Sequence, residues 1–203
     1  MPVTIPSGTE GYAAEAEALL RQYESITFAE VHQRVMHLMP KPPARVIDIG
    51  AGTGRDAAGF AALGHSVVAI EPTAALRTRA MRLHPSPRIE WIDDSLPDLP
   101  VVSARAETFD LVMLTAVWMH LDTQHRQRGM PRVAALVRPG GVLLMTLRHG
   151  PVPAGRRMFD VMPEATVDLA QQSGLSCIQC WQNSDSVLKR PDITWDRLAF
   201  ARA

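Results

Sequence analysis

The sequence has few cysteines, few lysines and no excess of either charge. Two cysteines in 203 residues cannot build a disulfide framework. Lys and Arg number 21, as do Asp and Glu, so the formal net charge is zero. This balance gives no support to a nucleic-acid binder with a basic surface or to a polybasic membrane anchor. Only Lys41 and Lys189 are lysines. The arginine bias reflects either genomic base composition or a preference for planar contacts with anions.

Long apolar runs are also missing. No run approaches the roughly 20 residues that a membrane span needs. The start, from Met1 to Gly11, is polar and interrupted by proline, without the basic and apolar blocks of a signal peptide. A composition with 46% hydrophobic and 21% charged residues is typical of a globular protein. Together with the length, these features predict one cytoplasmic domain covering residues 1–203.

The first forty residues are expected to form a helical cap of two helices. In the first helix, Ala16, Leu19 and Tyr23 fall on one apolar face. The second begins at Thr27, whose hydroxyl can cap the helix while Glu30 reaches back to the cap. Its apolar stripe predicts a helix that continues to the prolines at 40, 42 and 43.

Residues 44–203 alternate between short apolar runs and stretches with helical periodicity. Strands are predicted at 46–49, 66–70, 89–92, 109–115, 142–147, 175–181 and 193–201, and helices near 55–63, 73–83, 123–137 and 163–174. Such alternation predicts an α/β three-layer sandwich around a mostly parallel sheet. The last two strands are adjacent in sequence, which indicates an antiparallel last strand. Gly129 and Pro131 predict either a kink or a restart in the third helix.

The densest local signal is a glycine-rich turn after the first strand. Gly50, Gly52 and Gly54 follow Val46–Ile49 and lead directly into a helix. Glycine suits a sharp turn against which a ligand lies closely. Asp48 precedes the first glycine by two residues. A carboxylate there would repel a pyrophosphate and suits a ligand that carries positive charge.

Acidic residues also end the next two strands. Glu71, before Pro72, ends the second strand and can accept hydrogen bonds from both hydroxyls of a ribose. The third strand ends in Asp93, Asp94 and Ser95, where a carboxylate could accept from an adenine amino group. Three acidic strand tips therefore favour one ligand with an amino acid, a ribose and an adenine.

At this point residues 45–150 resemble the class I, or Rossmann-like, S-adenosylmethionine-dependent methyltransferases of the small bacterial type that acts on small molecules. The resemblance also includes the segment Asp94–Pro97, the strand from Phe109 and the Arg138–Gly141 turn. It implies a seven-stranded sheet, S-adenosylmethionine as methyl donor with S-adenosylhomocysteine as product, and no metal. The residues that it places at the cofactor are Asp48, Gly50, Ala51, Gly52, Gly54, Arg55, Glu71, Pro72, Asp93 or Asp94, Ser95, Thr115 and Trp118. For Trp118, a place in the core is the alternative.

A general base helps methyl transfer to a hydroxyl or a protonated amine, and His120 is the candidate. It follows the fourth predicted strand, in a segment that lines the methyl-transfer site in this family. The alternative is a histidine that only packs or hydrogen-bonds beneath the cofactor. The segment lacks the Asn/Asp-Pro-Pro-aromatic pattern of enzymes that methylate nucleobase amino groups, which counts against a nucleic-acid substrate.

Two regions are candidates for binding the methyl acceptor. The loop after the fifth predicted strand contributes Arg148, His149, Arg156 and Arg157, which could grip a carboxylate or phosphate. This loop could instead be solvated, or Arg156 and Arg157 could pair with Asp160 and Glu164. The helical cap contributes Tyr23 and His32. For Tyr23 a place as a core anchor is the favoured alternative, and His32 is the more suggestive of the two because it is polar on an otherwise apolar stripe.

The Cys177–Cys180 pair has the spacing of a redox or zinc motif but is expected in a strand, where residues three apart point to opposite faces. The sequence therefore predicts a methyltransferase that acts on a small, in one option anionic, molecule and needs no nucleic acid or membrane. A monomer or a homodimer is expected. Two alternatives remain: a cofactor-binding regulator or subunit without turnover, and an enzyme that uses the same cofactor for another reaction.

Overall fold

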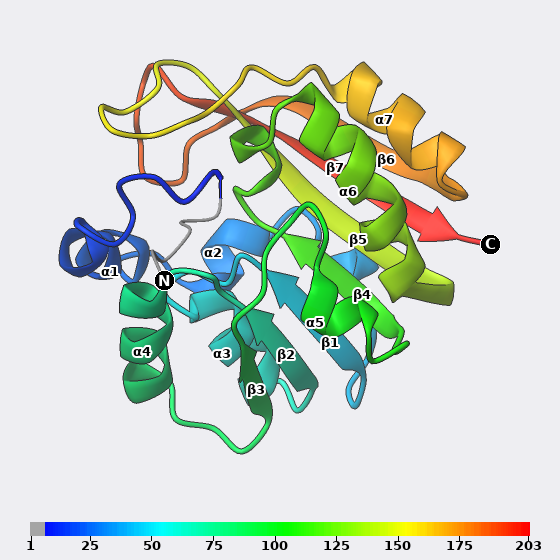
Figure 1. The fold of residues 1–203 in the computed structure, drawn as a ribbon, viewed down its shortest axis with the longest axis horizontal. Coiled ribbons are helices and arrows are strands. Elements are labelled where there is room, and N and C mark those ends of the chain that lie inside the picture. Colours follow the sequence, from blue (N-terminus) through cyan, green and yellow to red (C-terminus); the bar gives the residue numbers. More distant parts are fainter. Residues whose placement is uncertain (1–6) are drawn as a thin grey trace.

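The computed structural model describes residues 7–203 and contains one seven-stranded sheet with strand order β3-β2-β1-β4-β5-β7-β6 (Figure 1). β7 pairs antiparallel with both β5 and β6, and the other neighbours pair in parallel. The strands are β1 (Arg45–Ile49), β2 (Ser66–Ile70), β3 (Ile89–Ile92), β4 (Phe109–Leu114), β5 (Val137–His149), β6 (Leu175–Asp185) and β7 (Thr194–Arg202). The predicted α/β fold with its antiparallel last strand is confirmed.

Helices cover both faces of the sheet. Along β1, Val46 packs on one face while Ile47 and Ile49 pack on the other, as the two-residue period of a strand requires. The first face is covered by α3 (Arg55–Ala62), and the second by α5 (Pro100–Ser103), α6 (Thr123–Leu136) and α7 (Pro163–Gln172). α4 (Ala74–Leu83) lies beside α1 (Ala16–Tyr23) (Figure 1). No helix within residues 7–203 is long and apolar enough to cross a membrane.

The second N-terminal helix is shorter than its apolar stripe predicts. The capping box forms as expected, because the Thr27 hydroxyl accepts from the Glu30 amide and the Glu30 carboxylate accepts from Thr27. However, α2 covers only Phe28–His32, and a 3-10 turn (η1, Met36–Leu38) follows. The amide of Val35 donates to the carbonyl of His32 at 2.8 Å, three residues back, which tightens the chain while Val35 stays buried.

α6 passes through Gly129 and Pro131 as one helix, so the restart, one of the two alternatives for this segment, does not occur. Two further expectations about secondary structure are corrected. β5 begins at Val137, five residues earlier than the apolar run indicates. A bulge in β6 shifts its register, so that Cys177 faces Phe200 and Cys180 faces Leu198. The two cysteines thus oppose residues two apart on β7 and share a face, contrary to the prediction, and both are free thiols.

Candidate active site

A cavity of about 550 Å³ opens at the carboxyl ends of the central strands. This is where ligands bind in open α/β sheets. Four parts of the chain enclose it: the strand ends, the N-terminal segment with α1, the loop after β5 and the loop between β6 and β7. Most of the predicted site residues line it, namely Tyr23, Asp48, Gly50, Ala51, Gly52, Arg55, Glu71, Pro72, Asp94, Ser95, Thr115, His120, Arg148 and Arg156.

The glycine loop shows why a side chain is not tolerated at its first position. Gly50 has φ +77°, and a Cβ there would stand 2.5 Å from Cγ2 of Val117. Gly54, in contrast, does not line the cavity. It starts α3 with φ +86° and packs against Trp91, so its part is to shape the turn rather than to touch a ligand.

Asp48 carries a buried carboxylate that is incompletely paired. Its side chain is 1% exposed, and Oδ2 has no hydrogen-bond partner within residues 7–203. Burial, with the nearby charge of Asp56, raises the pKa of Asp48 well above its ordinary value, and Arg55 offsets this only in part. A buried, uncompensated acidic group at the cavity wall suits a cationic ligand.

Backbone amides orient the two other acidic tips. Glu71 Oε2 accepts from the Gly52 amide at 2.9 Å, and Oε1 accepts from the Thr73 amide at 2.7 Å. Burial raises the pKa of Glu71 despite these bonds. Asp94 accepts from the amides of Ser95 and Val102, both at 2.9 Å. The Thr73 hydroxyl also bonds to the Glu71 carboxylate. Because a carboxylate offers about four acceptor sites, both side chains can still accept from a further donor.

Asp93 and Trp118 lie elsewhere. The Asp93 carboxylate is exposed and pairs with Arg77 at 2.7 Å, so Asp94, rather than Asp93, faces the cavity. Trp118 is fully buried in the core on the α6 side of the sheet and does not line the cavity. The alternative of a core position is therefore the correct one for Trp118.

His32 does not line the cavity but contacts Asp56 in the first turn of α3, directly after the glycine loop. Its Nε2 lies 2.9 Å from Asp56 Oδ2, while Arg55 Nε donates to Asp56 Oδ1 at 2.8 Å. Burial alone would raise the pKa of Asp56, but His32 and Arg55 outweigh it and lower that pKa far below its ordinary range. The predicted substrate contact by His32 is replaced by this buried ionic cluster at the start of α3.

His120 forms a hydrogen-bonded pair with Tyr12, a residue that the sequence did not single out. Nδ1 of His120 lies 2.8 Å from the Arg157 carbonyl, which can only accept, so Nδ1 carries the proton. Nε2 is then the acceptor for the Tyr12 hydroxyl at 3.0 Å. Burial lowers the pKa of His120, and Arg156 and Arg148 add to this effect, whereas the Arg157 carbonyl opposes it. The imidazole is consequently held neutral with its basic nitrogen toward Tyr12.

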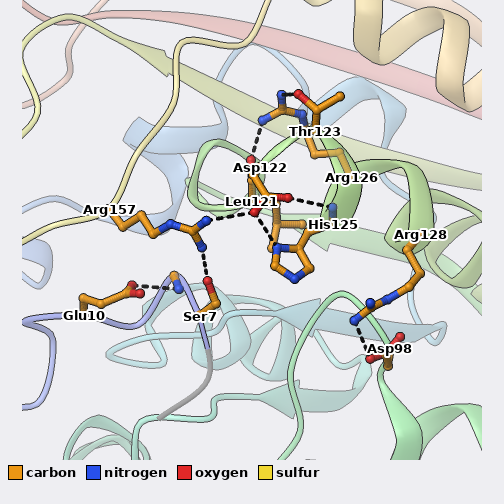
Figure 2. A network of polar contacts seen from close by, with 11 residues as sticks. Ser7, Glu10, Asp98, Leu121, Asp122, Thr123, His125, Arg126, Arg128 and Arg157 are labelled. Carbon is orange, nitrogen blue, oxygen red and sulfur yellow. Dashed lines mark hydrogen bonds and ion pairs between the residues drawn. The ribbon is translucent and has the colours of Figure 1, made fainter.

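Two of the three arginines predicted to grip an anion, Arg156 and Arg157, instead have partners in other parts of the chain. Arg156 stacks on the Tyr12 ring at 3.9 Å and pairs with Glu15 at 2.7 Å. Arg157 does not line the cavity; it contacts Ser7 and Asp122 (Figure 2). Neither arginine pairs with Asp160 or Glu164 in the described part of the chain.

His149 is also outside the cavity. Its Nδ1 lies 2.8 Å from Asp160, and its Nε2 lies 2.8 Å from the buried Asp196 of β7. Burial alone would lower the pKa of His149, but the two carboxylates outweigh it and raise that pKa. His149 therefore fastens the loop after β5 to the sheet rather than binding a ligand.

Two further cavity residues, Arg190 and Arg197, were missed. Arg197 and Asp196 place charges in the predicted strand 193–201 directly before the apolar run Leu198–Ala201, and this was the available signal. Arg190 gives no such signal, because it lies in a polar loop. Within residues 7–203, no group of three or more His, Cys, Asp or Glu side chains is placed to hold a metal ion.

Comparison with known proteins agrees with this geometry. Residues 46–141 match the methyltransferase domain family. A demethylmenaquinone methyltransferase of Clavibacter sepedonicus is 28% identical over 128 residues, which are 62% of this chain and 50% of that protein. The chain thus spans about half the length of this curated relative.

Two solved structures share the fold. Burkholderia thailandensis 1,6-didemethyltoxoflavin-N1-methyltransferase, solved with 1,6-didemethyltoxoflavin and S-adenosylhomocysteine, superposes with a TM-score of 0.73 at 16% identity, covering 95% of this chain and 85% of that one. A TehB-like methyltransferase from Corynebacterium glutamicum gives 0.70 at 17% identity, covering 94% and 99%. In its fold, its acidic strand tips and the domain matched over residues 46–141, the chain is similar to the class I S-adenosylmethionine-dependent methyltransferases.

Proposed function

We propose that the protein transfers a methyl group from S-adenosylmethionine to a nucleophilic atom of a small molecule bound beside Tyr12 and His120. One observation carries the proposal. A single cavity joins the incompletely paired carboxylate of Asp48 with a neutral histidine whose basic nitrogen points into the site. The first group suits a cationic cofactor, and the second suits removal of a proton from an acceptor.

The residues present fit the cofactor. Asp48 would hold its ammonium group, Glu71 its ribose hydroxyls and Asp94 its adenine amino group, with the bare backbone at Gly50 allowing close approach. S-adenosylmethionine supplies a methyl group already activated on a sulfonium. What remains for the protein is to align the acceptor, exclude water and, where the acceptor is protonated, take its proton.

Tyr12 and His120 form the proton path. The acceptor gives its proton to the Tyr12 oxygen while the Tyr12 proton passes to Nε2 of His120, leaving a neutral tyrosine and an imidazolium. Burial, with Tyr23 beside it, raises the pKa of Tyr12, so the phenol relays a proton and is not itself stored as a phenolate. The Arg157 carbonyl holds Nδ1–H throughout.

The N-terminal segment closes this end of the cavity. Gly8 packs on His120, and Arg156 ties Tyr12 and Glu15 to the loop after β5. Figure 1 shows the segment, in blue, beside this loop, in yellow. The enclosure favours an acceptor of limited size, in keeping with the small 1,6-didemethyltoxoflavin bound to the Burkholderia relative.

Two measurements test the proposal. Calorimetry with S-adenosylhomocysteine should show one saturable site, and absence of binding would reject the cofactor assignment. A screen of small-metabolite fractions with S-adenosylmethionine labelled in the methyl group should yield a labelled product. Cofactor binding without any labelled product would favour a regulator or a partner subunit, and consumption of the cofactor without methyl transfer would favour a different reaction.

A further inference from the structure

Three arginines line the cavity from the half of the sheet that contains β5, β7 and β6, whereas the acidic strand tips belong to the half that contains β1, β2 and β3. Arg148 belongs to β5, Arg197 belongs to β7, and Arg190 lies in the loop between β6 and β7. None of the three forms an ion pair with an acidic side chain in the described range 7–203. They differ in this from Arg156, which also lines the cavity but is paired with Glu15.

The strand register brings two of these arginines together. In the antiparallel β5–β7 pair, Thr146 lies opposite Arg197, and Arg148 lies opposite Trp195. Opposed residues and residues two apart project from the same face of a sheet. Arg148 and Arg197 are therefore diagonal neighbours on one face, and Thr146 between them is fixed by accepting the Ala116 amide at 2.8 Å.

Both strand arginines are buried without compensation for their charge. Arg148 is 8% exposed and Arg197 is 7% exposed. Arg148 donates to the carbonyls of Gly150 and Pro151 and to the thioether sulfur of Met158, and these neutral partners orient the guanidinium without neutralising it. Nη1 of Arg197 is buried and has no hydrogen-bond partner within residues 7–203. Buried charges are ordinarily paired, so this arrangement is incomplete without an anion.

The charges around the two strand arginines also favour a negatively charged ligand. After burial, the positive charge of Arg190 is the largest influence that lowers the pKa of Arg148. The charge of Arg34 does the same to Arg197. The groups around each guanidinium therefore include further cations, which makes the demand for a negative ligand stronger.

Apolar side chains surround the arginines and narrow the class of ligand. Val187, Leu188 and Trp195 line the cavity beside them, and Met158 approaches Arg148. A planar guanidinium group can donate two parallel hydrogen bonds to a carboxylate. The apolar side chains suit a ligand whose carboxylate is attached to an aromatic or aliphatic group.

We propose that Arg148, Arg190 and Arg197 form an anion subsite that recognises the carboxylate of the methyl acceptor, which would make the substrate a small apolar carboxylic acid. The proposal rests on the proposed function and adds the class of acceptor to it. The acceptor would lie with its carboxylate on β5 and β7 and its nucleophilic atom toward Tyr12. The cationic cofactor would bind at the acidic ends of β1, β2 and β3, beside this acceptor.

Benzoate and its neutral analogue benzamide test the subsite. Binding of each to the full chain is measured by calorimetry with and without saturating S-adenosylhomocysteine, alongside inorganic phosphate. We expect benzoate to bind at least tenfold more tightly than either benzamide or phosphate. Arg197→Gln and Arg148→Gln should each weaken benzoate binding at least tenfold and change S-adenosylhomocysteine affinity less than twofold. Arg128→Gln, which alters an exposed arginine paired with Asp98, is the matched control and should leave both affinities unchanged.

Each contrary result has a distinct meaning. Equal or absent binding of benzoate and benzamide overturns the anion subsite, and tighter binding of phosphate overturns the carboxylate assignment. If the arginine variants weaken S-adenosylhomocysteine and benzoate by the same factor, the arginines hold the carboxylate of the cofactor and the proposal is wrong. Failure of S-adenosylhomocysteine itself to bind the unaltered protein rejects the proposed function, whereas the benzoate measurement without it still decides the anion subsite.

Discussion

The Tyr12 hydroxyl lies 3.0 Å from Nε2 of His120, although 108 positions separate the two residues in the chain. The contact joins the N-terminal segment to the turn after β4, and it involves the nitrogen of His120 that the Arg157 carbonyl leaves unprotonated. Arg156 keeps the phenol in place by stacking on its ring. Tyr12 and His120 therefore act as one unit, and changes at either residue report on the other.

His120→Gln should lower kcat by about 10²–10⁴-fold, because glutamine cannot take up the proton that Tyr12 relays. S-adenosylhomocysteine affinity should stay the same. Because burial lowers the pKa of His120, the unaltered enzyme should lose activity on the acid side only below the ordinary histidine value of about 6.5. Steady-state rates between pH 5 and 9 measure both effects.

Tyr12→Phe is the companion variant. It leaves Nε2 of His120 free to accept a proton directly, so we expect a smaller loss of kcat than in His120→Gln. Unchanged rate and pH profile in His120→Gln would show that the pair is structural.

Asp48→Asn should stabilise the cofactor-free protein and weaken cofactor binding at the same time. The buried carboxylate is raised in pKa because its charge is poorly compensated, and the amide removes that charge. The same change removes the partner for a cationic ligand. Thermal denaturation with and without S-adenosylhomocysteine measures both effects, and a lower melting temperature without ligand would contradict the argument. In the unaltered protein, affinity should fall as pH decreases through the raised pKa.

Glu71→Gln should weaken S-adenosylhomocysteine binding about 10–100-fold, equivalent to the roughly 1.5–3 kcal/mol of a hydrogen bond to a charged group. Glutamine replaces one acceptor by a donor that would face the amide of Gly52 or Thr73. Calorimetry gives the affinity. Asp93→Asn is the control. Because the Asp93 carboxylate is exposed and lies outside the cavity, this variant should bind S-adenosylhomocysteine as tightly as the unaltered protein. Equal affinities in both variants would remove Glu71 from the ribose position.

The parts of the site that local patterns encode could be predicted from the sequence. A strand, a glycine turn and an acidic strand tip all lie within a few residues of each other. Asp48, Gly50 and Glu71 thus line the cavity as expected. The parallel pairing of the first five strands follows from the same alternation of elements.

Contacts between distant segments could not be predicted in this way. Arg156 and Arg157 are adjacent in sequence, yet only Arg156 lines the cavity, because their partners Glu15 and Asp122 come from different elements. Likewise, the helical pattern indicated that His32 is a polar residue on an apolar stripe. Its partner Asp56 belongs to α3, so the pattern could not predict their contact. A sequence pattern shows which polar residues lie on an apolar face, whereas the fold determines which side chains they contact.

His149→Gln should destabilise the protein in a pH-dependent manner while leaving S-adenosylhomocysteine affinity unchanged. Because the carboxylates raise the pKa of His149 above its unfolded value near 6.5, its stabilisation is complete below that pH and is lost as pH rises through the folded pKa. We expect a loss of about 1 kcal/mol at pH 6, discounted for the exposed Asp160, and a smaller loss at pH 9. Urea denaturation at both values measures this, with the exposed His37→Gln as control; a loss that is larger at pH 9 would refute the charged bridge between Asp160 and Asp196.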